Sequence, residues 1–176
     1  MGVTSMREEI AAGPPLPLGR RIELPDRGIT FVRELPGPTE DAPALLLLHG
    51  WIASAGLNWF QAFDALSEHF RVIAVDQRGH GRGLRTWKRF RLADCADDAV
   101  ALADVLGIDR FIPVGYSMGG LIAQLAWHRH PGRVGGLVVV AAGSIGDPLE
   151  RLGVGRAAVP GGENAHRGVH ALPVQL

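Results

Sequence analysis

The residue best placed to do chemistry is Ser117, in the segment Gly115-Tyr116-Ser117-Met118-Gly119. Before this segment lies an apolar run typical of a buried strand, Phe111 to Val114, and after it an amphipathic stretch typical of a helix. So sharp a turn from strand to helix strains the backbone of the serine and exposes its hydroxyl at the end of the strand. We therefore expect Ser117 to be a nucleophile.

A second glycine-containing segment, His49-Gly50-Trp51, directly follows the apolar run Ala44 to Leu48. In a parallel sheet the ends of this strand and of the strand before Ser117 lie side by side. We expect the backbone N–H groups of Trp51 and Met118 to form an oxyanion hole there. His49 directly follows a buried strand, which favours a hydrogen-bonded structural role over that of a catalytic base.

A third loop, Asp76-Gln77-Arg78-Gly79-His80-Gly81-Arg82-Gly83, follows the apolar run Arg71 to Val75. We expect Asp76 and Arg78 to hold this loop by hydrogen bonds, and His80 not to be a base. The basic, aromatic-containing stretch 82–91 allows either a phosphate or nucleic-acid site or a solvated loop. The equal numbers of basic and acidic residues, 18 each, favour the solvated loop and no nucleic-acid partner.

The elements that must position these loops follow from the apolar patterning. We predict two initial strands joined by a turn at Gly28, then buried strands alternating with helices, which is typical of an α/β fold whose mostly parallel sheet follows an antiparallel hairpin. The predicted strands are Arg21 to Leu24, Thr30 to Glu34, Ala44 to Leu48, Arg71 to Val75, Phe111 to Val114 and Leu137 to Ala142. The predicted helices are Trp59 to His69, Leu92 to Leu106, and one from Ser117 to Arg129.

The three loops, in this order, resemble the α/β-hydrolase fold superfamily, in its serine esterase or lipase-like branch. The resemblance covers roughly residues 20–146. It implies hydrolysis of carboxylic esters or related acyl bonds of a small molecule, without a cofactor, through Ser117 and the amides of Trp51 and Met118. A serine at this position disfavours the dehalogenase and epoxide-hydrolase branches, which use an aspartate there.

In this superfamily the catalytic acid and then the histidine follow the nucleophile along the chain. Only one predicted strand follows Ser117, so we expect a partial fold that lacks the last two strands through C-terminal truncation. Asp147, with Glu150 nearby, is the candidate acid, and His166 or His170 is the candidate base. The alternative is a catalytically impaired remnant or a binding module of the same fold.

We expect a loose leader over residues 1–19, the hydrolase core over 20–146 and an irregular, flexible tail over 147–176. The N-terminus lacks the apolar segment of a signal peptide, and no apolar run reaches the roughly 20 residues of a membrane span. With one cysteine, Cys95, this predicts a cytoplasmic protein without a membrane span. The apolar strand Leu137 to Ala142 is expected at the edge of the sheet, which would need the tail, a second copy of the chain or a partner to cover it. If the edge stays uncovered, copies could associate there.

Overall fold

The computed structural model describes residues 16–143 and 169–171, and its centre is one mixed β-sheet. The sheet has seven strands in the order β1-β2-β4-β3-β5-β6-β7. Strands β4, β3, β5 and β6 are parallel, while β1, β2 and β7 are antiparallel to their neighbours. The strands are β1 (Gly19–Leu24), β2 (Gly28–Leu35), β3 (Ala44–Leu48), β4 (Arg71–Asp76), β5 (Phe111–Tyr116), β6 (Val138–Val140) and β7 (Val169–Ala171). The predicted hairpin followed by a mostly parallel sheet is confirmed.

The turn of the hairpin has the predicted backbone requirement. Arg27 N–H donates to the carbonyl of Leu24 at 3.0 Å, and Gly28 has a φ of 120°. Residues with a Cβ rarely adopt that conformation, so glycine lets β2 begin directly after the turn.

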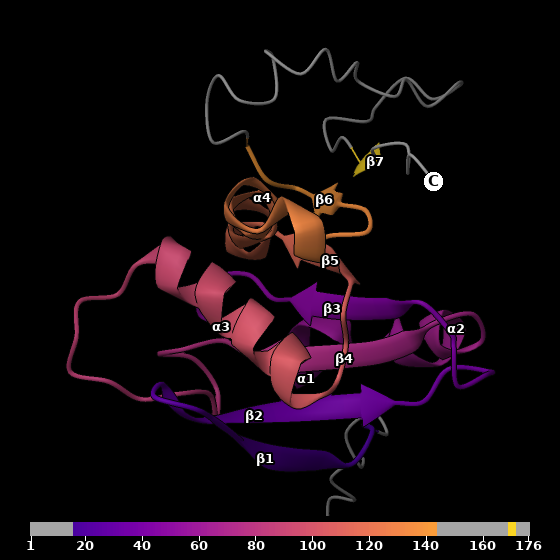
Figure 1. Ribbon diagram of the computed structural model, residues 1–176, viewed down its shortest axis with the longest axis horizontal. Helices are drawn as coiled ribbons and strands as arrows, with labels where there is room; N and C mark the ends of the chain where they lie inside the picture. The colour runs from indigo at the N-terminus through magenta and orange to yellow at the C-terminus, as the bar shows by residue number, and fades with distance from the viewer. Residues whose placement is uncertain (1–15, 144–168, 172–176) are drawn as a thin grey trace, which may run out of the picture.

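Helices cover the sheet on both faces (Figure 1). The longer pair, α3 (Leu92–Val105) and α4 (Met118–Arg129), lies on one face, and the short helices α1 (Ala55–Trp59) and α2 (Phe63–Ser67) lie on the other. Side chains alternate along β3 as a twice-covered strand requires. Leu46 and Leu48 join the cluster under α3 and α4, whereas Leu45 and Leu47 join the cluster with Phe63.

The single helix predicted over Trp59 to His69 is wrong. The chain forms α1 and α2 instead, because α1 begins earlier, where the Ser54 hydroxyl caps it by accepting the N–H of Leu57. The Ala62 N–H then bonds to the carbonyl of Trp59 at 2.8 Å in the turn between the helices. In the described part of the chain, no helix is long and apolar enough to cross a membrane.

Of the three covers expected for the edge strand Leu137 to Ala142, the structure shows the tail. Strand β7 pairs antiparallel with β6 and places His170 opposite Val139 (Figure 1). Residues 169–171 therefore form a strand within the segment expected to be irregular. The physical reason is that the outer N–H and C=O groups of β6 need partners, and three residues of extended chain supply them.

The loop after β4 is fastened to α3 by a buried ion pair. The guanidinium of Arg78, whose side chain is 7% exposed, donates two hydrogen bonds to Asp98, from Nε at 2.6 Å and from Nη2 at 2.7 Å. Arg27 also donates to Asp98. These hydrogen bonds raise the pKa of Arg78. The predicted role of Arg78 in holding the loop is confirmed.

This geometry predicts unequal effects for two neighbouring aspartates. Asp98→Ala leaves the buried Arg78 charge without its bidentate partner and should lower the free energy of unfolding by about 3 kcal/mol. Asp97→Ala is the matched control, because the side chains of its partners Arg129 and His130 are 42% and 30% exposed, and it should cost at most about 1 kcal/mol. Urea unfolding measures both values, and equal losses would contradict the role given to Arg78.

Candidate active site

Ser117 lies at the turn between β5 and α4 in a strained backbone conformation. Its φ is 52° and its ψ is −116°, a combination that non-glycine residues rarely adopt. Two hydrogen bonds hold the residue there: its N–H donates to the carbonyl of Val140 at 2.9 Å, and its own carbonyl accepts the N–H of Gly120 at 2.9 Å. The strained serine predicted from the sequence is therefore present, and its side chain is partly exposed.

The glycines around Ser117 allow contacts that no larger residue permits. A Cβ on Gly119 would lie 2.0 Å from the carbonyl oxygen of Leu48, and one on Gly115 would lie 2.2 Å from that of Gly119. Helix α4 thus begins in direct backbone contact with the end of β3 and with β5. These two glycines are a packing requirement of the turn.

The loop after β3 reaches the serine as predicted. A Cβ on Gly50 would lie 3.4 Å from the Cβ of Ser117 and 3.1 Å from the ring of Tyr116. No hydrogen-bond acceptor occurs for the N–H of Trp51 or of Met118 among the residues that the structure describes. Both amides are therefore available beside Ser117, and the N-terminus of α4 adds a partial positive charge.

His49 is held in a structural role, as expected. It is fully buried, its Nδ1 lies 2.7 Å from the carbonyl oxygen of Gly50, and its Nε2 accepts the N–H of Gln77 at 3.0 Å. Since Nε2 is an acceptor, the ring proton is on Nδ1 and donates to Gly50. Burial lowers the pKa of His49 and keeps the ring neutral. Both ring nitrogens are engaged, so this histidine has no nitrogen free for Ser117.

Asp76 organises the second loop. One carboxylate oxygen accepts the N–H of Ala55 at 2.7 Å, and the other accepts the N–H of Arg82 at 2.8 Å. Its carbonyl accepts the hydroxyl of Thr30 at 3.0 Å. The predicted tying role of Asp76 is confirmed, and it extends to the start of α1.

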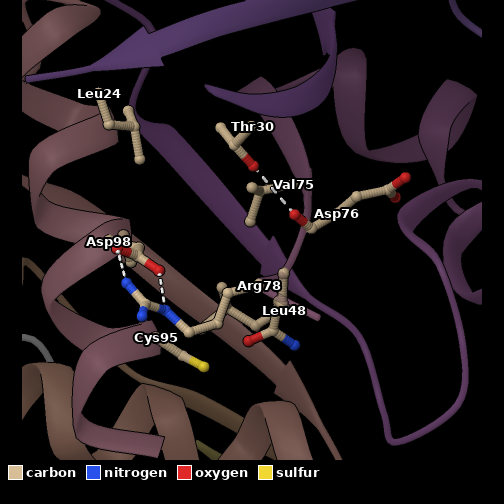
Figure 2. A pocket seen from close by; sticks show the side chains of 10 residues that line it. Leu24, Thr30, Leu48, Val75, Asp76, Arg78, Cys95 and Asp98 are labelled. Carbon is tan, nitrogen blue, oxygen red and sulfur yellow. Dashed lines mark hydrogen bonds and ion pairs between the residues drawn. The ribbon is translucent and has the colours of Figure 1, made fainter. Parts of the chain in front are cut away.

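A small cavity lies between the end of β4 and α3, on the Arg78 side of the loop (Figure 2). Figure 2 shows Arg78 reaching Asp98 across it, with the Cys95 thiol beside the pair. Burial raises the pKa of the Cys95 thiol to about 12, so the thiol stays protonated. The lining contains none of Ser117, Trp51 and Met118. This cavity therefore belongs to the scaffold of the loop.

An aromatic cluster lies on the loop after β3, the loop that contains Gly50 and Trp51. The Trp51 indole packs edge-on against His80, with ring centroids 4.9 Å apart, and against Phe90 at 5.5 Å. Nδ1 of His80 lies 3.0 Å from the carbonyl oxygen of Arg78. The Trp51 side chain is still 58% exposed. The cluster therefore presents an aromatic surface next to the Gly50 contact with Ser117.

The basic stretch 82–91 forms a loop that leads to α3, in line with the solvated-loop alternative. The Arg85 guanidinium donates to three carbonyls of its own loop, those of Gly81, Gly83 and His80. The Arg82 guanidinium lies 3.6 Å from the centre of the Phe31 ring. These two arginines serve the loop and the hairpin, which weakens the anion-site interpretation.

The candidate acid and base are not brought to Ser117 by the described residues. Asp147, Glu150 and His166 lie outside those residues, and the backbone of His170 lies in β7, beyond β6 from the strand that leads to Ser117. Nε2 of His130 lies 2.8 Å from a carboxylate oxygen of Asp97. His130 follows the far end of α4, and this helix, about 18 Å long, separates it from Ser117. Within residues 16–143, no histidine is hydrogen-bonded to Ser117.

The site contains one residue that the sequence did not single out. Asn58, in α1, accepts the N–H of Gly50 with its Oδ1 at 3.0 Å. No local pattern marks this asparagine, because its partner lies eight residues earlier and is reached only through the fold.

A strained serine between strand and helix, with two free amides beside it, is an arrangement that known proteins share. The family model described as alpha/beta hydrolase fold matches residues 43–164. The chain belongs to the α/β-hydrolase fold family. The partial fold inferred from the three loops is thereby confirmed.

Curated relatives resemble this chain over only part of their own length. RutD of Caulobacter sp. (strain K31), whose name assigns it to carbamate hydrolysis, is 35% identical over 142 residues, which are 80% of this chain and 53% of that protein. The bifunctional esterase/perhydrolase DCH of Acinetobacter calcoaceticus is 41% identical over 85 residues, 48% of this chain and 30% of that protein. The chain spans about half the length, or less, of the curated relatives it matches.

Solved structures show the same partial match. Naproxen esterase from Bacillus subtilis superposes with a TM-score of 0.62 and 31% identity, covering 70% of this chain and 42% of that one. The enol-lactonase from Burkholderia xenovorans LB400 superposes with a TM-score of 0.59 and 28% identity, covering 67% and 45%. The architecture around Ser117 is therefore that of known hydrolases.

The glycine packing predicts that Gly119→Ala disrupts the turn. The added methyl group would lie 2.0 Å from the Leu48 carbonyl oxygen, so backbone must move, and the free energy of unfolding should fall by about 3 kcal/mol or more. Gly132→Ala is the control, because no atom lies within 4 Å of its new Cβ, and should change stability by less than about 0.5 kcal/mol. Urea unfolding of both variants decides the matter; a stable Gly119→Ala protein would refute the packing argument.

The buried His49 predicts an acid-sensitive stability. The folded state takes up the imidazole proton less readily than the unfolded chain, because burial lowers the folded pKa. The free energy of unfolding should therefore decrease as the pH falls below about 6.5 towards the lowered pKa, by up to about 1.4 kcal/mol per pH unit. His49→Gln, which does not titrate, should lose this part of the slope. Unfolding measured from pH 8 to pH 5 tests the difference, and parallel curves would argue against it.

Proposed function

We propose that this chain carries the nucleophile and the oxyanion hole of a serine hydrolase acting on carboxylic esters or related acyl bonds. The observation that carries the proposal is the strained backbone of Ser117 beside the free amides of Trp51 and Met118. The names of the relatives support acyl chemistry, since they include an esterase and an enol-lactonase.

In the proposed reaction, Ser117 Oγ attacks the carbonyl carbon of the bound substrate. The carbonyl oxygen becomes an oxyanion and accepts hydrogen bonds from the amides of Trp51 and Met118, which bind the developing charge better than the neutral carbonyl. The alcohol or other leaving group departs with a proton, which leaves an acyl-serine. Water then releases the acid and restores the serine hydroxyl.

The serine proton needs an acceptor, because an unassisted serine hydroxyl is a weak nucleophile. His166 and His170 remain the candidate bases of this proposal, and Asp147 remains the candidate acid. His49 is excluded from the role by its two hydrogen bonds to backbone groups.

The substrate we propose is a small molecule with an apolar or aromatic part. The exposed Trp51 indole, held by His80 and Phe90, offers a flat apolar surface next to the serine. A nucleic-acid partner is not part of the proposal, since Arg85 already serves carbonyls of its own loop. A cytoplasmic location is part of it, because a single cysteine, Cys95, fits a reducing compartment.

A catalytically impaired member of the family, retained as a binding module, is the second candidate. One observation favours it: within residues 16–143, Ser117 has no hydrogen bond to a histidine. The two candidates share the fold and the oxyanion amides, and they differ in whether the serine is activated.

Labelling with a fluorophosphonate probe separates the two candidates. We expect the full chain to take up the probe at one position and the Ser117→Ala variant to take up none, as intact mass and in-gel fluorescence can measure. His166→Ala and His170→Ala then test the base, and loss of labelling by about 100-fold in one of them would identify it. Well-folded wild-type protein that stays unlabelled would favour the binding module.

A further inference from the structure

We propose that Asn58 is a positioning residue of the oxyanion site: its side chain orients the loop that carries the Trp51 amide. The inference rests on the proposed function, because it concerns the same oxyanion. Its starting point is the hydrogen bond from the Gly50 N–H to Oδ1 of Asn58, 3.0 Å long. Asn58 reaches Gly50 and makes no hydrogen bond to Trp51 itself.

Gly50 is the flexible point of this loop. As a glycine it has an unusually wide choice of φ and ψ, and those two angles set the direction of the following N–H. A side chain at this position would narrow the choice, but its Cβ would lie 3.1 Å from the Tyr116 ring, closer than most real Cβ contacts, and 3.4 Å from the Cβ of Ser117. Glycine therefore fits this position best. The restraint must come from hydrogen bonds to the two peptide groups that flank Gly50.

Both flanking peptide groups are held, each by a different side chain. In the peptide group before Gly50, the Gly50 N–H donates to Asn58. In the peptide group after Gly50, the Gly50 carbonyl oxygen lies 2.7 Å from Nδ1 of His49. In a planar trans peptide the N–H points opposite to the C=O. With the Gly50 carbonyl turned towards His49, the N–H of Trp51 must point the other way.

Asn58 is itself held on a firm support. Its own N–H bonds to the carbonyl of Ser54 at 3.0 Å, and the first turn of α1 is attached to the end of β4 through Ala55 and Asp76. The loop that contains Gly50 and Trp51 is thus connected to the end of β4 twice, through Asn58 and α1 and through His49, which accepts the N–H of Gln77. Loss of the Asn58 oxygen would free the first peptide group and leave the second held by His49 alone.

The expected effect is on rate more than on binding. Removing an oxyanion donor outright lowers catalytic rates by about 100-fold to 1,000-fold, and mispositioning one should cost less, about tenfold. A misdirected amide stabilises the oxyanion of the transition state less well. The complex with the unreacted probe depends little on that hydrogen bond. The concentration of probe at half-saturation should therefore change by less than about twofold.

The test compares Asn58→Ala, Asn58→Asp and Ser54→Ala in the full chain. Ser54→Ala removes the cap of the same helix and leaves the Gly50 hydrogen bond intact, so it controls for damage to α1. Asn58→Asp keeps an acceptor oxygen in place. Two quantities are measured: the maximal rate of phosphonylation of Ser117 by a fluorophosphonate, and the hydrogen-exchange rate of the Gly50 amide by NMR.

For Asn58→Ala we expect about a tenfold lower maximal rate, an almost unchanged half-saturating concentration and faster exchange at Gly50. Asn58→Asp and Ser54→Ala should both retain slow exchange at Gly50 and lose less than about threefold in rate. Labelling of Asn58→Ala at the wild-type rate, or an equal loss in Ser54→Ala, overturns the positioning role. If the wild-type protein takes no label, the proposed function fails, and the exchange comparison alone decides whether Asn58 orders Gly50.

Discussion

The candidate site depends on how closely the start of α4 approaches the end of β3. Gly119 meets the carbonyl of Leu48 at a distance where no Cβ fits, and Gly115 meets Gly119 in the same way. This contact places Ser117 beside Gly50, because Ser117 is the first residue after β5 and Gly50 is the second residue after the neighbouring strand β3. A backbone shift of about 1 Å at this contact would move the serine relative to the loop after β3, and misplacements of that size are costly in active sites.

The polar groups around this contact are used almost entirely for support. His49, Asn58 and Asp76 all bind backbone groups of the loops, and Arg78 binds Asp98 across the gap to α3. Buried polar atoms stabilise a fold only when they are paired, so these residues hold the loops at little net gain in stability. Their benefit is geometric: three loops from separate strand ends keep fixed positions around one serine.

Much of the site could be predicted because its determinants are local in the chain. The strained serine and the glycines around it follow from a single short segment, and the structural role of His49 follows from its place at the end of a buried strand. Asn58 could not be predicted, since its importance comes from a partner that only the fold brings near. Which of the three expected covers lies on the strand Leu137 to Ala142 could not be predicted for a similar reason, because β7 comes from a distant part of the chain.

The sequence by itself determined the alternation of strands and helices, the α/β class and the position of the strained turn at Ser117. Apolar periodicity and glycine spacing act within a few residues, so they can be read without a structure. The tertiary structure alone decided where α1 and α2 separate, which side chains hold Gly50 and which nitrogen atoms of His49 are engaged. These outcomes depend on hydrogen bonds between residues far apart in sequence, and such bonds form only after the sheet has brought the strand ends together.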